Sequence, residues 1–339
     1  MPAMPTAFGL LVTNQHPPHD AAPDRWRETV EQVRLARDLG FDLVLFGQHF
    51  LATEFQMLQP TVAAARLAGE TGSMRIGVTI YLVPLLNPVQ LAEDTASLDI
   101  VTGGRFIFGV GLGYRKVEDD AFGLAPGARV GRTLAHLGVV TRLWAGEPVS
   151  YESPECTLRG ATTLVRPVQK PRPPIWVAAN NDGAVVRAAE IGDTWIVNPH
   201  ATIATIVRQL ELFRATRARL GRAAPAEIPL LRELCVGETR GEAVRVTRPF
   251  LERKYQAYVA WGQHKVLPGD DDMTQTFDDL ARDRFIIGDP AECAAEIQCT
   301  LERTGATAIV FRLHWPGLPH EVVMRSLRLL GEKIRPLVR

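Results

Sequence analysis

The sequence predicts an α/β fold, a single (β/α)8 TIM barrel spanning residues 1–339 with insertions after strands four and seven. Eight short apolar segments, each typical of a buried strand, alternate with segments whose apolar residues recur at helical spacing. No linker, short repeat or low-complexity tract divides the chain, and 339 residues suit one barrel with insertions. Parallel strands joined by helices on this scale favour a barrel over two domains.

The first half of the chain supplies four strand–helix units. Its predicted strands, rich in Val, Ile, Leu and Phe, are residues 8–13, 42–46, 75–81 and 105–110. The predicted helices begin near Pro23, Thr61 and Pro88, and the first ends at Gly40. A helical pattern at 134–144 and an irregular hairpin at 149–164 form the insertion after the fourth strand.

The second half repeats the alternation. Its predicted strands are residues 175–178, 194–197, 228–236 and 308–313. The predicted helices are residues 184–190, 203–220 and 242–261, one that begins after Asp289-Pro290, and 319–337. The polar stretch 267–283 carries Pro268-Gly269 and an acidic run and leads towards the last strand, so we expect a mobile lid there.

Composition excludes several classes of function. Lys plus Arg and Asp plus Glu both total 38, so no excess positive charge points to a nucleic acid or an anionic membrane. The four cysteines form no C-x-x-C pair, the N-terminus lacks a signal-peptide pattern, and no apolar run is long enough to span a membrane. We therefore expect a cytoplasmic protein. H-E-x-x-H and G-x-S-x-G are absent, so we expect no metal site and no hydrolase nucleophile.

A glycine-rich segment, GRFIFGVGLGYRKVEDDAFG, covers residues 104–123. Its glycines at 109, 111 and 113 are spaced G-x-G-x-G, three βα units precede them, and no clean amphipathic helix follows, which disfavours a Rossmann dinucleotide loop. In a barrel this position is the carboxyl end of the fourth strand, where active sites lie. The glycines would let backbone lie flat against a planar ligand; the alternative is a turn that needs positive φ.

The same segment resembles the corresponding part of the bacterial luciferase family, the luciferase-like flavin-dependent monooxygenases. LGFDLVLFGQHFLATEF (39–55) resembles the family's glutamate-histidine-histidine stretch, and residues 75–106 match its third strand and following helix. PPIWVAANNDGAVVRAAEIGDTWIVN and IIGDPAECAAEI fit later segments on the phosphate side. The resemblance covers most of the chain and is densest over residues 8–123.

The resemblance implies FMN, or in some branches deazaflavin, at the carboxyl face of the barrel. In the oxygenase branch, reduced FMN arrives as a co-substrate from a separate NAD(P)H:flavin reductase, and O2 then oxidises a small organic substrate. A homodimer or a hetero-oligomer of related barrels is also implied. Two alternatives stay open, a deazaflavin-dependent oxidoreductase that transfers hydride and a non-catalytic flavin-binding barrel. The phosphate region shows no Lys/Arg cluster for the longer anionic tail of deazaflavin, which favours FMN.

Three residues are candidates for catalysis. His49 ends the second strand and matches the second of the family's paired histidines, so we expect it to contact the flavin or transfer a proton; a structural histidine is the alternative. Asn14 follows the first strand, and Tyr114 follows the glycines. Gln48 and Gly47 replace the family's first histidine and its preceding glutamate, so the resemblance points to a relative rather than a luciferase.

The predicted cofactor-binding residues lie on three segments. Residues 179–183 precede a helix and offer backbone N–H groups to a phosphate. Leu112 stands where the family member used for comparison has an arginine, and a non-prolyl cis peptide is expected between Val78 and Thr79. Nearby Arg115 and Glu118 are both expected to be solvated. The full set is Val78, Thr79, Tyr81, Gly111, Leu112, Gly113, Ala179, Asn180, Asn181, Asp182 and Gly183.

Overall fold

A computed structural model describes residues 6–268 and 271–338. Among them, eight parallel strands close a barrel, which confirms the predicted fold class. In order around the barrel they are β1 (Ala7–Val12), β3 (Leu43–Phe46), β5 (Arg75–Leu82), β6 (Phe106–Gly111), β9 (Ile175–Ala179), β10 (Thr194–Val197), β11 (Pro229–Val236) and β13 (Ala308–Arg312). The last of these pairs with β1, so these eight strands leave no open edge.

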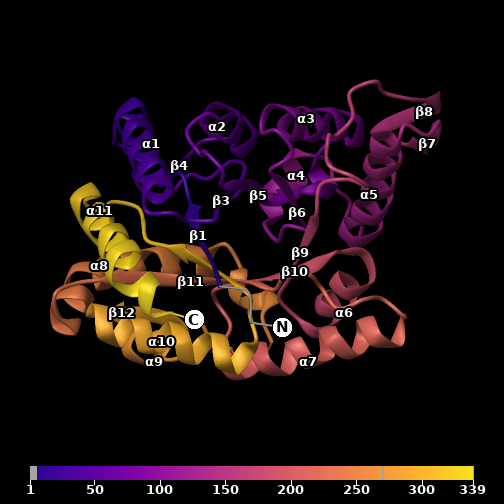
Figure 1. Cartoon of the computed structure of the whole chain (residues 1–339). Helices are drawn as coiled ribbons and strands as arrows, with labels where there is room; N and C mark the ends of the chain where they lie inside the picture. The colour runs from indigo at the N-terminus through magenta and orange to yellow at the C-terminus, as the bar shows by residue number, and fades with distance from the viewer. Residues whose placement is uncertain (1–5, 269–270, 339) are drawn as a thin grey trace.

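The helices that follow the strands form the outer layer (Figure 1). They are α1 (Ala22–Asp38), α2 (Pro60–Leu67), α3 (Pro88–Val101), α6 (Asp182–Ile191), α7 (Ile203–Arg219), α8 (Arg240–Ala260), α10 (Pro290–Thr304) and α11 (His320–Leu329). The expected N-cap Asp289 forms a full capping box with Glu292 at the start of α10. The predicted last helix is divided, because α11 is followed by a short π-helix (Leu330–Ile334) and a 3-10 turn (Arg335–Leu337).

Two apolar layers hold the barrel together. The inner layer fills the barrel with one or two side chains from most strands, namely Leu11, Leu43, Leu45, Ile107, Trp176, Ile196, Leu231 and Val310. The outer layer lies between strands and helices and includes Val44, Phe108 and Trp195. Successive strand residues face opposite sides, and both sides are covered, so the strands read as continuous apolar runs rather than as alternating ones.

The insertion after β6 contains α4 (Lys116–Ala121), α5 (Arg129–Ala145) and the antiparallel hairpin β7 (Val149–Ser153) with β8 (Cys156–Ala161). The hairpin projects beside α5, away from the barrel (Figure 1). Glu155 in its turn contacts His136 and Arg132 of α5, both at 3.1 Å, and these ion pairs fix the hairpin against the helix. The predicted hairpin is confirmed, whereas α5 begins earlier than its sequence pattern indicates.

The insertion after β11 contains α8, a 3-10 turn (Gln263–Val266), α9 (Phe277–Ala281) and β12 (Phe285–Gly288), which pairs with β11. Sequence analysis missed β12, a ninth strand of the sheet that lies outside the expected alternation of eight strands and helices. Residues 269 and 270 of the expected lid lie outside the described residues. In the described part, Leu267, Met273 and Phe277 are buried, so it is less polar in its packing than its composition suggests. Its opening stays a prediction.

Two glycines of β6 make room for the neighbouring strand. A Cβ on Gly109 would lie 2.8 Å from the Thr79 Cα, and a Cβ on Gly111 would overlap the Ile80 side chain. The β5–β6 register shifts between Val78 and Tyr81, so the irregular part of β5 presses directly on these glycines. The open question about the glycines is thereby answered: these two admit a bulge, and Gly113, at φ +72°, provides the turn.

We expect Gly109→Ala to lower the free energy of unfolding by about 1–3 kcal/mol, because its methyl group would press on strand backbone that cannot rotate away. Gly138→Ala is the matched control, since Gly138 lies exposed on α5 with nothing within 4 Å of an added Cβ. The control should gain about 0.5–1 kcal/mol from better helix propensity. Denaturant unfolding of both variants checks this, and equal effects would contradict the bulge argument.

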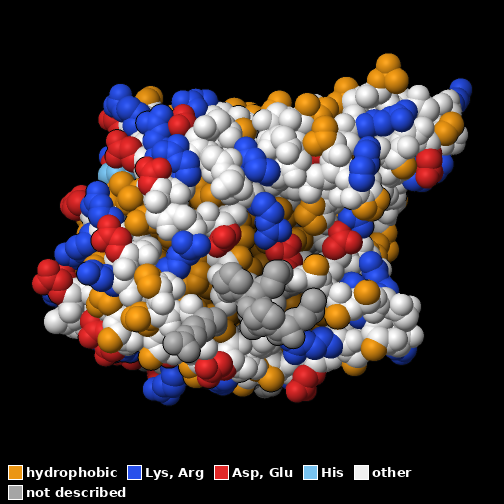
Figure 2. Space-filling model, in the orientation of Figure 1, with side chains coloured by type: hydrophobic (Ala, Val, Ile, Leu, Met, Phe, Trp, Pro, Cys, Tyr) orange, Lys and Arg blue, Asp and Glu red, His pale blue; other side chains and the backbone are white. Residues whose placement is uncertain are grey.

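No helix of the described residues is long and apolar enough to cross a membrane. On the face shown in Figure 2, acidic and basic side chains are interspersed, in keeping with equal totals of the two.

Candidate active site

A cavity of about 250 Å³ lies at the carboxyl ends of the barrel strands. Its floor is apolar and includes Leu11, Ile196 and Leu231 of the barrel interior. The rim comes from segments that follow the strands: 47–49 after β3, 112–114 after β6, 179–181 at the end of β9 and 198–200 after β10. This is the face at which barrel enzymes carry out their chemistry.

The structure brings eight of the predicted site residues together in this cavity. They are His49, Thr79, Leu112, Gly113, Tyr114, Ala179, Asn180 and Asn181. Six others do not line it, namely Asn14, Val78, Tyr81, Gly111, Asp182 and Gly183. Ile80 and Leu82 line it in place of Tyr81, whose hydroxyl instead lies 3.0 Å from that of Thr61. Successive side chains of a strand point to opposite faces, so a residue next to a lining residue in the sequence does not itself have to line the cavity.

The cis peptide bond expected between Val78 and Thr79 lies one residue further on, between Thr79 and Ile80. It falls within the shifted register of β5 and β6. The prediction of a non-prolyl cis bond at this bulge was therefore wrong in its position by one residue.

Asn14 lies behind the cavity wall. Its φ of +52° and 2% exposure place it in a tight, buried turn after β1, and neither atom of its amide has a hydrogen-bond partner among the described residues. Its neighbours Thr13 and Gln15 line the cavity instead. A catalytic role for Asn14 stays a prediction, whereas Gln15 emerges only from the structure.

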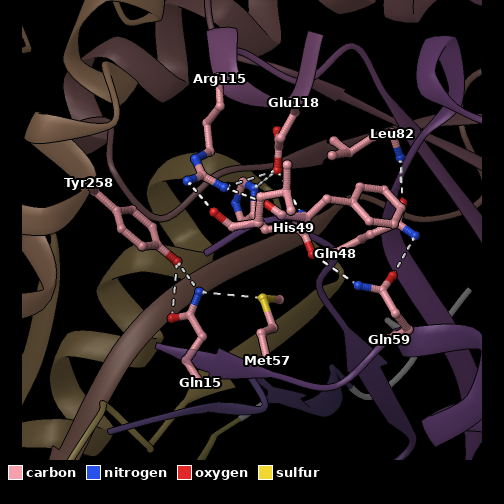
Figure 3. A network of polar contacts seen from close by, with 11 residues as sticks. Gln15, Gln48, His49, Met57, Gln59, Leu82, Arg115, Glu118 and Tyr258 are labelled. Carbon is pink, nitrogen blue, oxygen red and sulfur yellow. Dashed lines mark hydrogen bonds and ion pairs between the residues drawn. The ribbon is translucent and has the colours of Figure 1, made fainter. Parts of the chain in front are cut away.

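His49 belongs to a buried ion-pair network (Figure 3). Its Nδ1 lies 3.0 Å from Oε1 of Glu118, which also contacts Nη1 of Arg115 at 3.3 Å and accepts a hydrogen bond from the Phe50 N–H at 2.9 Å. Arg115 donates to the backbone carbonyls of Phe50 and Leu51 and so fixes the loop that carries His49. The guanidinium of Arg115 lies over the Trp261 ring, 4.2 Å from its centroid.

The expectation that Glu118 and Arg115 are solvated was wrong: their side chains are 1% and 5% exposed. Burial by itself raises the pKa of Glu118, but the hydrogen bond from His49, the Phe50 N–H and the charge of Arg115 together hold that pKa below its ordinary value. Glu118 is therefore ionised at neutral pH. Because an ionised carboxylate can only accept hydrogen bonds, Nδ1 of His49 carries the proton and Nε2 is left for other contacts.

Gln48 anchors the end of β5. Its Oε1 accepts a hydrogen bond from the Leu82 N–H at 2.9 Å, and its Nε2 donates to Gln59 at 3.3 Å, as Figure 3 shows. The Gln59 amide in turn donates to the carbonyl of His49 at 3.1 Å. The residue that replaces the family's first histidine therefore positions the backbone on which His49 and Leu82 sit.

The part of the cavity wall at the start of α6 is polar and carries a cation, in contrast to the apolar floor. Asn180, Asn181, Ala184 and Arg187 all line the cavity. Asp182, which could have repelled an anion, turns away and pairs with Arg208 at 2.6 Å. Arg187 forms no ion pair with any described carboxylate, and burial lowers its pKa. The charge of Glu190 on the same helix partly offsets that of Arg187, and an arginine without a direct ion pair beside a helix start suits an anion.

A second cavity of about 350 Å³ adjoins the first, and His49 and Met57 line both. Its walls are mainly apolar and include Phe50, Phe55 and Phe122. Met57 also accepts a weak hydrogen bond from Gln15, whose amide donates to the Tyr258 hydroxyl at 3.1 Å (Figure 3).

Among the lining residues that were not predicted from the sequence are the polar residues Gln15, Arg187, Tyr258 and Arg312. Gln15, which closely follows β1, and Arg312, at the carboxyl end of β13, carried a positional signal that could have identified them. Within the described part of the chain, no three His, Cys, Asp or Glu side chains are placed to hold a metal ion.

The family model for luciferase-like monooxygenases matches residues 6–308. The chain belongs to this family. The luciferase-like protein is 24% identical to the alkanal monooxygenase alpha chain of Photorhabdus laumondii subsp. laumondii over 98% of each chain. The family comprises flavin-dependent monooxygenases and oxidoreductases, so the chain is an enzyme with oxidoreductase activity.

Solved structures agree on the fold. The monooxygenase RslO1 of Streptomyces bottropensis superimposes with a TM-score of 0.86 at 24% identity, covering 97% of this chain and 99% of that one. The oxygenating constituent of 3,6-diketocamphane monooxygenase from Pseudomonas putida, in complex with FMN, gives 0.84 at 16% identity and covers 99% of both chains. An F420-dependent secondary alcohol dehydrogenase gives 0.80 at 20%, covering 99% of this chain and 100% of that chain, so both cofactor types occur on this fold.

Proposed function

We propose that this luciferase-like protein is an FMN-dependent monooxygenase that receives reduced FMN from a separate reductase and oxidises a small organic substrate with O2. The observation that carries the proposal is a cavity lined by Arg187 and the start of α6, with a histidine–carboxylate pair at its rim. The structural relative that binds FMN is described as an oxygenating constituent, which supports a reductase partner.

The phosphate end fits FMN. The guanidinium of Arg187 lines the cavity near the start of α6, where Asn181 caps the Ala184 N–H and Asp182 is neutralised by Arg208. The deazaflavin cofactor has a longer anionic tail that favours several cations. Of the described residues that line the cavity, only Arg187 and Arg312 carry permanent positive charge, and they come from different elements. A single cation at the start of α6 suits the one phosphate of FMN better than the longer anionic tail of deazaflavin.

The interior fits a flavin ring in a place from which water is excluded. Ile80, Leu82 and Leu112 present apolar surface near the middle of the cavity, and the barrel floor is apolar. Bound reduced flavin supplies the electrons that activate O2 for attack on the organic substrate. An apolar enclosure limits proton leakage and unproductive loss of those electrons.

His49 supplies the proton-transfer group. Glu118 holds the proton on Nδ1 and orients the ring, so that Nε2 can accept a proton from the substrate or return one. The edges of the Tyr114 and Trp261 rings flank His49, with centroids at 5.7 and 5.2 Å, and restrict its rotation. The preserved histidine therefore has the partners that general acid–base catalysis requires.

Arg187→Gln is expected to weaken FMN binding about tenfold or more, because it removes a charge-assisted hydrogen bond to the phosphate. Riboflavin, which lacks the phosphate, should bind the variant and the unchanged protein equally. Arg142→Gln is the matched control, since Arg142 pairs with Glu147 on the exposed face of α5 and should leave both affinities unaltered. Flavin fluorescence titration provides the measurement, and equal losses for FMN and riboflavin would refute the assignment of the phosphate site.

The choice of cofactor is tested by titrating the protein with FMN and with deazaflavin in both redox states. Tighter binding of FMN, together with substrate-dependent O2 consumption when a flavin reductase is added, is the expected result. Tighter deazaflavin binding with hydride transfer and no O2 consumption would establish the dehydrogenase alternative, and binding without turnover would leave a flavin-binding barrel.

A further inference from the structure

Arg312 is a buried cation on the cavity wall that the cofactor site does not use. It ends β13, lines the cavity, and its side chain is 11% exposed. Its Nη1 lies 3.3 Å from Oε1 of Glu233, whereas its Nε has no hydrogen-bond partner among the described residues. Arg312 also has a hydrogen bond with Tyr258, so its unsatisfied group is the Nε–H, and a buried N–H without an acceptor is costly unless a ligand supplies one.

Charge around Arg312 is unbalanced. Glu233, which is fully buried, also pairs with the buried Lys254 and accepts a hydrogen bond from the Trp315 indole at 2.6 Å. Among the described residues, no other carboxylate contacts Lys254 or Arg312. One carboxylate therefore serves two buried cations, and Arg232 adds a third buried cation on the neighbouring strand β11, with Nη2 unpaired. By contrast, buried Arg284 is balanced by Asp271 at 3.1 Å.

The two cations do not share Glu233 equally: burial lowers the pKa of Arg312, but Glu233, Tyr258 and Tyr255 outweigh it and raise that pKa, whereas the pKa of Lys254 is lowered. Burial, followed by the charge of Arg312, lowers the pKa of Lys254 to about 7, even though Glu233 acts in the opposite direction. A lysine at this pKa is close to losing its proton at neutral pH. An anion bound at Arg312 would restore the balance that the protein side chains do not supply.

Two tyrosines add hydrogen-bonding capacity beside Arg312. The hydroxyl of Tyr114 is buried without a partner among the described residues, and the residue lines the cavity. Burial, Tyr258 and Glu118 raise its pKa well above the ordinary value, against the opposing charges of Arg115 and Arg312, so it stays a hydrogen-bond donor. Tyr258 also lines the cavity, and its hydroxyl meets the Gln15 amide.

We propose that Arg312, with Tyr114 and Tyr258 beside it, binds a carboxylate group of the organic substrate. The planar guanidinium suits a carboxylate better than a compact ammonium would, and the unpaired Tyr114 hydroxyl can donate to the same oxygens, whereas the Tyr258 hydroxyl already donates to Gln15. The inference rests on the proposed function, because Arg187 at the start of α6 takes the cofactor phosphate and leaves Arg312 for the substrate. The substrate class is thus a small carboxylic acid whose remaining surface is largely apolar, matching the cavity walls.

The test compares benzoate with benzamide, which share a ring and differ in charge, by isothermal titration calorimetry on the flavin-free protein. The affinity for benzoate should exceed that for benzamide by a factor of about ten or more, as expected for a charge-assisted hydrogen bond. Arg312→Gln should abolish the preference, and Arg312→Lys should retain only part of it. Arg312→Gln leaves Glu233 paired with Lys254, so the variant should fold, as its melting temperature will show. Arg187→Gln is the control and should keep the preference.

Equal binding of both probes, or a preference that survives Arg312→Gln, would overturn the proposal. A repeat with FMN bound separates substrate from cofactor: retained benzoate binding supports the substrate assignment, whereas displacement of benzoate by FMN would assign Arg312 to the cofactor and refute it. The FMN and riboflavin titrations of the Arg187 variant are independent of these outcomes, so a failed cofactor assignment is recognised separately.

Discussion

His49→Ala is expected to lower reductase-coupled turnover by about a hundredfold or more, because the proton carried by Nε2 would have no other donor or acceptor in place. The fold should survive, since Glu118 keeps Arg115 at 3.3 Å and the Phe50 N–H at 2.9 Å without the imidazole. Binding of reduced flavin should weaken by about 1 kcal/mol at most, the value of one hydrogen bond. Turnover, melting temperature and flavin affinity are measured on the same preparations.

His49→Asn is the matched control. Its amide can donate to Glu118 from a position close to that of Nδ1, but it has no group that transfers a proton at the place of Nε2. If His49 acts through proton transfer, the two variants should be similarly slow. Recovery of turnover in His49→Asn would show that the histidine serves only to hold Glu118. If the activity of both variants instead falls in proportion to the fraction of folded protein, the role of His49 is structural.

Glu233→Gln should cost about 3–5 kcal/mol of unfolding free energy, since it leaves Lys254 and Arg312 buried without a counter-charge. Lys254→Met is the matched control, because Glu233 keeps both Arg312 and the Trp315 indole after that change. The control should therefore cost clearly less. Denaturant unfolding at one salt concentration measures the stability of both variants. A Lys254 variant as unstable as the Glu233 variant would contradict the role of Glu233 as the shared counter-charge.

The cost of Glu233→Gln should also depend on pH. Glu233 raises the pKa of Lys254 from what burial and Arg312 would otherwise impose, and that pKa is about 7 in the unchanged protein. Below the lower pKa that Lys254 has in the variant, Lys254 is charged in both folded proteins, so losing the carboxylate has its full effect. As pH rises towards 7, Lys254 releases its proton more readily in the variant, and the difference in stability should shrink. A constant difference between about pH 5 and pH 8 would contradict this coupling.

The barrel could be predicted from the sequence because each strand and helix carries its own local signal. Runs such as RIGVTIY and helix starts such as Asp289-Pro290 are decided by residues close together in the chain, and they were placed to within a few residues. The carboxyl face followed from strand order, so His49 and the segment before α6 were correctly located in the cavity. β12 was missed because it is a ninth strand, beyond the eight that the strand–helix alternation predicts, and it adds to the sheet only through its pairing with β11.

Only the tertiary structure decided which side chains meet. Glu118 lies in KVEDDA, which locally resembles an exposed helix start, and its burial depends on His49 from a distant loop. Position 109 has no room for a side chain because the irregular part of β5 packs against it, and no feature of the β6 sequence itself reveals this. The charge excess at Arg312 exists because β11, α8 and β13 bring one carboxylate to two cations. Local preferences fix elements, whereas electrostatic balance and close packing are properties of neighbours that only folding supplies.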